Sequence, residues 1–159
     1  MKQVGNVSLS IRLFGRFEVL HDGAPISSHE WGRRKTQALL KVLLTLPGRV
    51  FTQDQLIDAL FPDLELDKAV KNLYSRISEL RHILEPQLRK GGKSRFIQHV
   101  GQGYRFAVEG ECWIDIQEFE RYEQEARAAV EAGRWMSASE ACRSALDLYQ
   151  GEFLAEDRY

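Results

Sequence analysis

Five apolar residues between positions 70 and 84 recur at a helical spacing, and this pattern limits the fold more than any other feature of the chain. Val70, Leu73, Ile77, Leu80 and Leu84 are separated by steps of three, four, three and four residues. Such steps bring side chains to one stripe of an α-helix. We therefore predict an amphipathic helix of about 25 Å over residues 68–84, with its stripe against a core and its other face polar.

The segments before this helix predict a short sheet and two further helices. Residues 8–14 and 16–20 partly alternate apolar with polar side chains, which indicates a small antiparallel sheet. Apolar residues at helical spacing predict a nearly surrounded helix over residues 33–46. Thr52 and Gln55 have the spacing of a capping box, so we predict a short helix that begins there.

The segments on either side of residues 68–84 predict a cap and a hairpin. Asp67 follows an acidic loop and is the predicted N-cap of the long helix. Residues 95–100 and 104–107 are predicted strands, joined by the turn Gly101-Gln102-Gly103. Helix, loop, helix and hairpin in this order are typical of a winged helix, whose last helix enters the major groove of DNA.

The composition changes at residues 108–111, and a helical hairpin is predicted after that boundary. Asp115 is the predicted cap of a helix that ends at Gly133, and a second helix ends at Gly151. Small residues on facing stripes are typical of the hairpins from which tetratricopeptide-like arrays are built. One such hairpin cannot bury its stripe alone, so we expect the chain to be a truncated part of a longer protein. The predicted fold class is an α+β winged helix-turn-helix domain followed by an all-α tetratricopeptide-like hairpin.

The two parts of the chain carry opposite net charges. Residues 1–107 hold 17 Lys and Arg against 10 Asp and Glu, whereas residues 108–159 hold 5 against 13. A basic domain is typical of proteins that bind nucleic acid. The polar face of the long helix carries residue types that bind bases and phosphates, namely Lys68, Lys71, Asn72, Ser75, Arg76, Glu79 and Arg81. Further candidate cations are Arg33, Arg34, Lys35, Lys90, Lys93, Arg95 and Arg105.

Several segments fall in one order that resembles a known family. These segments are Trp31 to Leu40, Gly48 to Thr52, Leu56 to Phe61, Tyr74 to Arg81 and Gly103 to Phe106. Together they resemble the winged-helix domain of OmpR/PhoB-type regulators, in the variant of SARP-type bacterial transcriptional activators. The segments Asp115 to Phe119 and Ala145 to Leu154 resemble the start of the bacterial transcriptional activation domain that follows it there.

The resemblance implies a division into residues 1–107, the DNA-binding domain, and residues 112–159, the N-terminal part of the activation domain. It also implies a DNA-facing third helix with the polar residues given above, and a wing at Gly103, Tyr104 and Arg105. The wing lacks the cation that many relatives carry just before the turn, so Gln98, His99 and Gln102 are the side chains there that can reach a phosphate. The loop between the second and third helices touches RNA polymerase in such proteins, which makes Asp63, Leu64 and Glu65 the candidate polymerase contacts.

The predicted function is therefore sequence-specific binding of double-stranded DNA by a transcriptional activator, with a helical domain for a second protomer or RNA polymerase. The alternative is a protein-interaction scaffold whose winged helix does not read DNA. Catalytic residues and a cofactor are not expected, because no nucleophile elbow, third glycine of a dinucleotide loop or zinc-ligand spacing is present. Cys112 and Cys142 are predicted to be buried thiols. No apolar run reaches the length of a membrane span, so we expect a cytoplasmic protein without a membrane partner.

Overall fold

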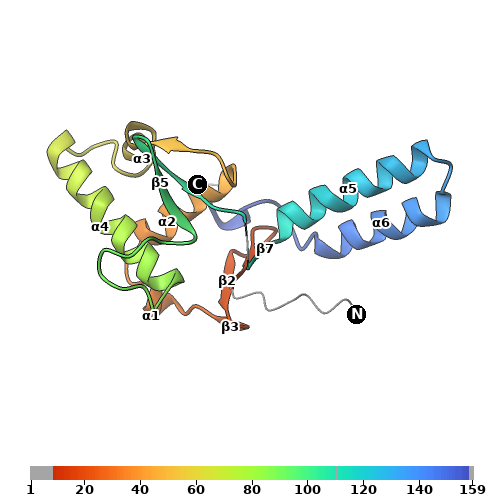
Figure 1. Cartoon of the computed structure of the whole chain (residues 1–159), viewed down its shortest axis with the longest axis horizontal. Coiled ribbons are helices and arrows are strands. Elements are labelled where there is room, and N and C mark those ends of the chain that lie inside the picture. The colour runs from red at the N-terminus through yellow and green to blue at the C-terminus, as the bar shows by residue number, and fades with distance from the viewer. Residues whose placement is uncertain (1–8, 110, 158–159) are drawn as a thin grey trace. The chain divides into compact units, whose positions relative to one another are not determined.

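The computed structural model describes residues 9–109 and 111–157, which form two compact units (Figure 1). One unit is Ser27–Gly110 and the other combines Met1–Ile26 with Glu111–Tyr159. The first is called the winged-helix unit here and the second the helical unit. The predicted division into residues 1–107 and 112–159 stays a prediction about function, whereas the strands within residues 9–26 pack in the helical unit.

The winged-helix unit has the predicted order of helices followed by a hairpin. Its elements are α1 (Ser28–Trp31), α2 (Arg34–Thr45), β4 (Phe51–Thr52), α3 (Gln53–Leu60), α4 (Leu66–Leu84), β5 (Ile97–Val100) and β6 (Gly103–Phe106). The strands form an antiparallel sheet in the order β4-β6-β5, so the hairpin β5-β6 is tied to the strand that precedes α3. The winged-helix arrangement predicted from the sequence is confirmed.

The apolar stripe of α4 lies in the core of this unit. Leu73, Ile77, Leu80 and Leu84 are buried, and Val70 is half-buried at its edge. They pack with the buried leucines of α2 and α3 and with the aromatic rings of the wing, a set that includes Leu39, Leu40, Leu43, Leu44, Leu56, Phe96 and Phe106. Because one stripe is fixed in this core, the opposite face of α4 is directed away from it.

The predicted helix caps are correct for α3 and wrong for α4. The Thr52 hydroxyl accepts a hydrogen bond from the backbone N–H of Gln55, and the Gln55 side chain accepts one from that of Thr52, as the capping box requires. Helix α4 instead begins at Leu66, with Glu65 at the N-cap and without a side-chain cap. Asp67 therefore lies inside the first turn, where its carboxylate favours the positive end of the helix dipole.

The helical unit joins a mixed sheet to the predicted helical hairpin. Its elements are β1 (Leu9–Arg12), β2 (Glu18–His21), β3 (Ala24–Pro25), β7 (Cys112–Ile114), α5 (Asp115–Glu131), α6 (Trp135–Leu148) and the 3₁₀ helix η1 (Ala155–Asp157). The strand order is β3-β2-β1-β7, and β7 pairs parallel with β1 across about a hundred residues of sequence. In Figure 1, α5 and α6 run side by side after β7. The sequence pattern predicted the hairpin but not β7.

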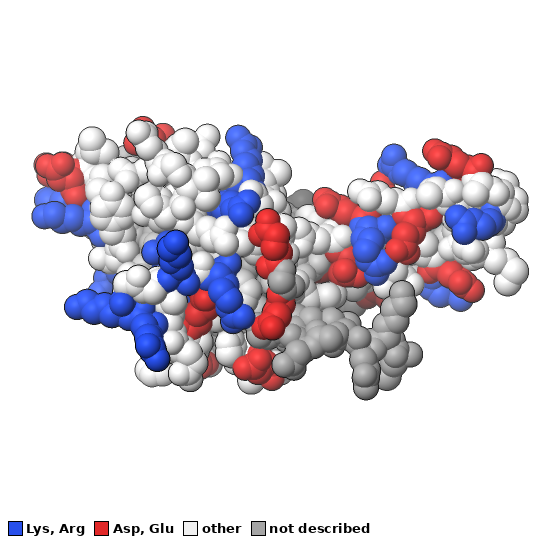
Figure 2. All heavy atoms as spheres, viewed as in Figure 1, with Lys and Arg blue, Asp and Glu red and all other residues white. Residues whose placement is uncertain are grey.

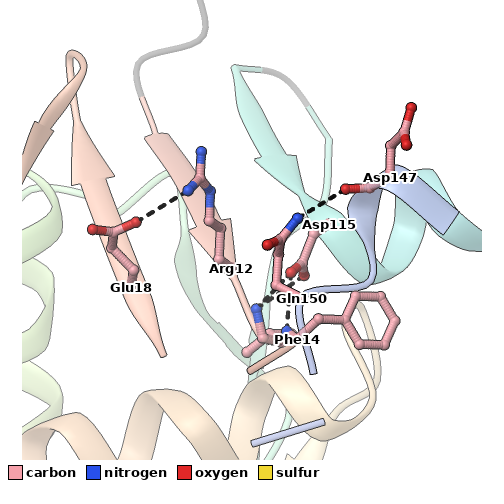
Figure 3. Close-up of polar contacts among 7 residues, drawn as sticks. Arg12, Phe14, Glu18, Asp115, Asp147 and Gln150 are labelled. Carbon is pink, nitrogen blue, oxygen red and sulfur yellow. Dashed lines mark hydrogen bonds and ion pairs between the residues drawn. The ribbon is translucent and has the colours of Figure 1, made fainter. Parts of the chain in front are cut away.

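Asp115 has a different role from the predicted cap. Helix α5 starts at Asp115 with Ile114 at the N-cap, and the Asp115 carboxylate is 2% exposed. Its oxygens accept hydrogen bonds from the backbone N–H groups of Leu13 (2.9 and 3.0 Å) and Phe14 (3.0 Å; Figure 3). They also accept one from the N–H of Ile116 at 2.8 Å. Burial raises the pKa of this carboxyl above its ordinary value, although the three donors act in the opposite direction. Asp115 therefore joins the end of β1 to the start of α5.

The segment after α6 contacts the same end of β1. The Gly15 N–H donates to the carbonyl of Glu152 at 2.8 Å, and the Leu154 N–H donates to that of Leu13 at 2.8 Å. The Phe14 ring lies 5.4 Å from the rings of Phe119 and Tyr149. Residues 13–15 thus contact both the start of α5 and the segment after α6, which explains why the N-terminal strands belong to this unit.

The two cysteines differ in exposure. Cys112 is half-buried, and burial raises the pKa of its thiol to about 12. Cys142 is exposed, so the prediction of a buried thiol is wrong for Cys142.

Among the described residues, each helix is too short or too polar to cross a lipid bilayer.

Candidate nucleic-acid interface

The face of α4 opposite the core presents a row of polar side chains to solvent. Lys71, Ser75, Ser78 and His82 are exposed and follow one another at steps of four, three and four residues. Tyr74, 49% exposed, borders this row. The side chains of Lys71 and Ser75 have no hydrogen-bond or ion-pair partner among the described residues, so both are available to a ligand. We call these five residues the open face of α4.

Two predicted members of this surface flank it at its N-terminal end. Lys68 is exposed and forms a surface ion pair with Glu65 at 3.7 Å. Asn72 is half-buried, and its Nδ2 donates to the backbone carbonyl of Lys68 at 2.8 Å. An exposed ion pair costs little to break, so Lys68 can exchange Glu65 for another anion.

Arg76 does not lie on the open face, and this corrects the sequence-based expectation. Its side chain is 5% exposed, and its Nη2 donates to Oε1 of Glu79 at 2.8 Å. The Arg76 Nε is buried without a hydrogen-bond partner among the described groups. The helical wheel places Arg76 between the polar face and the apolar stripe, and packing against the core turned it inward.

Glu79 connects α4 with the start of α2. Its Oε2 accepts a hydrogen bond from the Thr36 hydroxyl at 2.7 Å, and Arg33 lies 3.8 Å from its Oε1. With Arg76, two hydrogen-bond donors and one further cation therefore surround the Glu79 carboxylate. These contacts offset the negative charge of Glu79, which would repel a nearby phosphate. Through them, Glu79 links α4 to the start of α2.

Arg81 connects α4 with the wing and does not lie on the open face. Its Nε and Nη2 both donate to the backbone carbonyl of Ile97, at 3.1 and 3.0 Å. Its guanidinium also lies 5.9 Å from the centre of the Tyr104 ring. Burial raises the pKa of the Tyr104 phenol, Tyr74 adds to the rise, and Arg81 opposes it. Arg81 therefore positions the hairpin relative to α4.

The wing turn is fixed to the start of α3. The backbone N–H of Gln53 donates to the carbonyl of Gln102 at 3.1 Å, whereas the Gln102 side chain is exposed. Gly103 is buried against β4, because a Cβ there would lie 2.2 Å from the carbonyl oxygen of Phe51. Arg105 donates from Nε and Nη2 to the side-chain oxygen of Gln98, at 3.0 and 2.8 Å.

A polar cavity lies between α4, α3 and the wing turn. It measures about 320 Å³ and is lined by Gln53, Tyr74, His99 and Gln102 among others. The Tyr74 hydroxyl donates to Oε1 of Gln53 at 2.9 Å. The open face of α4 and the wing turn therefore border one polar recess, and an extended polar ligand can contact both.

The remaining predicted cations differ in their engagement. Arg34 and Lys93 are exposed and have no ion-pair partner among the described residues. Arg33 pairs with Glu79 as described above, Arg95 lies 3.6 Å from Glu85, and Lys35 donates to the carbonyl of Leu60. The loop residues Asp63, Leu64 and Glu65 are all exposed between α3 and α4, with Leu64 at 43%.

Sequence reasoning missed Tyr74, Ser78 and His82 as members of the open face. The spacing of Lys71, Ser75, Ser78 and His82 is the sequence signal for this face, and it includes short polar side chains as well as a long charged one. The winged-helix unit holds 14 Lys and Arg against 9 Asp and Glu, and Figure 2 shows Lys and Arg side chains spread over its visible surface. No group of three or more potential metal ligands occurs in the described part of the chain.

Two family models match the chain in the order that the structure shows. The family described as "Transcriptional regulatory protein, C terminal" matches residues 31–106, and "Bacterial transcriptional activator domain" matches residues 114–158. The first match covers nearly all of the winged-helix unit. The second covers α5 and α6 but not the strands β1 to β3, which belong to the same unit.

A curated protein and a solved structure are similar over nearly the whole chain. Regulatory protein AfsR of Streptomyces coelicolor (strain ATCC BAA-471 / A3(2) / M145) is 29% identical over 150 residues, which are 93% of this chain and 14% of AfsR. The structure of Mycobacterium tuberculosis EmbR in complex with a low affinity phosphopeptide has a TM-score of 0.78 and 27% identity. That match covers 95% of this chain and 38% of the EmbR chain. The chain thus spans a small part of the length of AfsR and less than half of that of EmbR.

Proposed function

We propose that this chain, whose two family matches combine the domains of the SARP-type bacterial transcriptional regulators, binds double-stranded DNA with α4 of its winged-helix unit in the major groove. The observation that carries the proposal is the open face of α4, where the side chains of Lys71 and Ser75 have no partner among the described residues. An α-helix fits the major groove, and lysine and hydroxyl side chains can bind base edges or phosphates there.

The contacts divide into two groups by chemistry. Lys68, Lys71, Arg34 and Lys93 supply phosphate contacts, which give affinity but little sequence information. Asn72, Tyr74, Ser75, Ser78 and His82 are the candidates for contacts with base edges. Gln102 at the wing turn reaches the neighbouring backbone. Arg76, Glu79 and Arg81 support this surface from within, because their side chains bind other parts of the unit.

The helical unit supplies the protein contact in this proposal, to a second protomer or to RNA polymerase. Trp135 and Met136 at the start of α6 are 68% and 80% exposed, and large exposed apolar side chains are typical of interaction surfaces. The loop of Asp63, Leu64 and Glu65 is a second candidate contact with polymerase. The activity is binding without chemical turnover, in the bacterial cytoplasm where the DNA is.

The experiment is a selection of bound fragments from random duplex DNA with the full chain, followed by titration of the selected duplex. We expect a selected motif and an affinity that falls with salt, by a log–log slope of about −0.9 for each phosphate neutralised. Lys71→Ala should reduce this slope by about one, whereas Arg134→Ala, which removes an exposed cation at the N-cap of α6, should not change it. Salt-independent binding or the absence of any selected motif would favour the protein-interaction scaffold instead.

A further inference from the structure

Residues 86–95, which lie in the loop between α4 and β5, include cations and no acidic residue. These cations are Arg89, Lys90, Lys93 and Arg95. Arg89, Lys90 and Lys93 are exposed, and none of the three side chains has a hydrogen-bond or ion-pair partner among the described residues. Cations that a fold leaves without partners are free to bind an anion without first breaking an ion pair.

The tip of this loop is an ordered turn. The N–H of Gly92 donates to the carbonyl of Arg89 at 2.8 Å, which closes a four-residue turn with Lys90 and Gly91 at its centre. Gly91 has a φ of 76°, a conformation that favours glycine. A Cβ on Gly92 would lie 2.9 Å from the Arg89 carbonyl oxygen, so the second glycine is also required by the close approach.

Glu85 anchors the base of the loop. This residue follows α4, is 8% exposed, and accepts hydrogen bonds from the Ser94 hydroxyl and, at 2.9 Å, from the backbone N–H of Arg95. The Ser94 hydroxyl in turn accepts a hydrogen bond from the Ile97 N–H at 3.0 Å. The loop therefore starts and ends at one buried carboxylate, and binding a ligand there has a small cost in conformational entropy.

A cavity joins this loop to the open face of α4. It measures about 290 Å³, and its lining includes Ser78 and His82 from α4 with Arg89, Gly91 and Gly92 from the loop. Figure 2 shows Lys and Arg side chains gathered over the part of the unit where Figure 1 places the C-terminal half of α4 and the loop that follows. A polyanion that follows the open face of α4 would thus reach the loop at its C-terminal end.

We propose that the loop of Arg89, Lys90 and Lys93 is a second DNA-backbone clamp, which binds phosphates at the C-terminal end of α4. This inference rests on the proposed function, because it requires that DNA lies along the open face. The chemistry is charge pairing with phosphate oxygens, so the loop adds affinity and does not choose the sequence. It extends the bound site beyond the base pairs that α4 can read.

The test is the triple variant R89A/K90A/K93A in the full chain, titrated with the selected duplex over a range of salt concentrations. We expect the log–log slope to become shallower by about 2 to 3 and the affinity at low salt to fall by about tenfold or more, with the same selected motif. The matched control is R127A/R134A/R143A, which removes three exposed cations from the helical unit and changes the net charge equally. That control should bind DNA with the slope of the unchanged chain.

Hydroxyl-radical footprinting gives a second readout that does not depend on affinity. At saturating protein, the unchanged chain should protect sugars at one end of the site that R89A/K90A/K93A leaves open. A slope and footprint like those of the unchanged chain would refute the clamp and leave the proposed function intact. The absence of any salt-dependent DNA binding by the unchanged chain would refute both.

Discussion

Replacement of Arg76 tests whether this residue reads DNA or stabilises the fold. Arg76 is 5% exposed and pairs with Glu79, so Arg76→Ala removes a buried side chain and one of the two hydrogen-bond donors to the Glu79 carboxylate. Loss of a fully buried ion-pair partner costs about 3–5 kcal/mol, and Glu79 is 37% exposed to solvent, which lowers this figure. We expect the free energy of unfolding to fall by about 2–3 kcal/mol.

Arg76→Met is the informative partner of this variant. Methionine keeps most of the buried aliphatic volume and removes a guanidinium whose Nε has no partner among the described groups, so it should cost less than about 1.5 kcal/mol. Urea denaturation measures both stabilities, and titration with the selected duplex below the unfolding range measures affinity. If either folded variant lost preference at one base pair by more than about tenfold, Arg76 would be a base contact and the argument from its burial would be refuted.

Three other predictions concern the wing and the helical unit. Gly103→Ala should destabilise the chain by about 1–3 kcal/mol in urea denaturation, because the added Cβ would meet the Phe51 carbonyl. Gly101→Ala should cost only about 1 kcal/mol, because Gly101 has a φ of 58° but open space around it. Equal costs for the two variants would contradict this reasoning. Asp115→Ala should cost about 2–4 kcal/mol by leaving the N–H groups of Leu13 and Phe14 unpaired, and Asp147→Ala on the surface of α6 should stay within about 0.5 kcal/mol of the unchanged chain. Because burial raises the pKa of Asp115 above its ordinary 3.8, the folded chain keeps this proton to higher pH than the unfolded chain. Its contribution to stability should therefore be complete below about pH 3.8 and decrease as the pH rises through the folded pKa, and a stability difference between the unchanged chain and Asp115→Asn that is constant with pH would contradict this.

Local patterns predicted the winged-helix unit well because its signals are short in sequence. The stripe of α4, the capping box at Thr52 and the glycine turn at residues 101–103 each depend on neighbours within a few residues. The prediction that the third helix exposes Arg76 was wrong for a different reason, which also explains why Arg81 is half-buried. Both residues lie at the borders of the polar face, where packing against α2 or the wing decides which way a long side chain turns.

The helical unit shows which information the sequence pattern lacks. An aspartate before an amphipathic stretch is a good predictor of an N-cap, and Asp115 follows that pattern. Its carboxylate instead binds backbone groups 101 and 102 residues away, and no local rule identifies that partner. Strand β7 has only three residues, and its strand character depends on the parallel pairing with β1.

The topology of the helical unit changes how the chain should be divided for functional work. The polypeptide forms β1, β2 and β3, continues into the winged-helix unit at Ser27, and returns at Glu111 to form β7 on the other side of β1. The winged-helix unit is thus an insertion in the sequence of the helical unit, although the family boundary lies near residue 114. A fragment that starts at the family boundary would lack β1 and with it the amides that bind Asp115. We therefore expect the helical unit to need residues 9–26 in order to fold, so loss of function in a variant of these strands would not by itself be a defect in DNA binding.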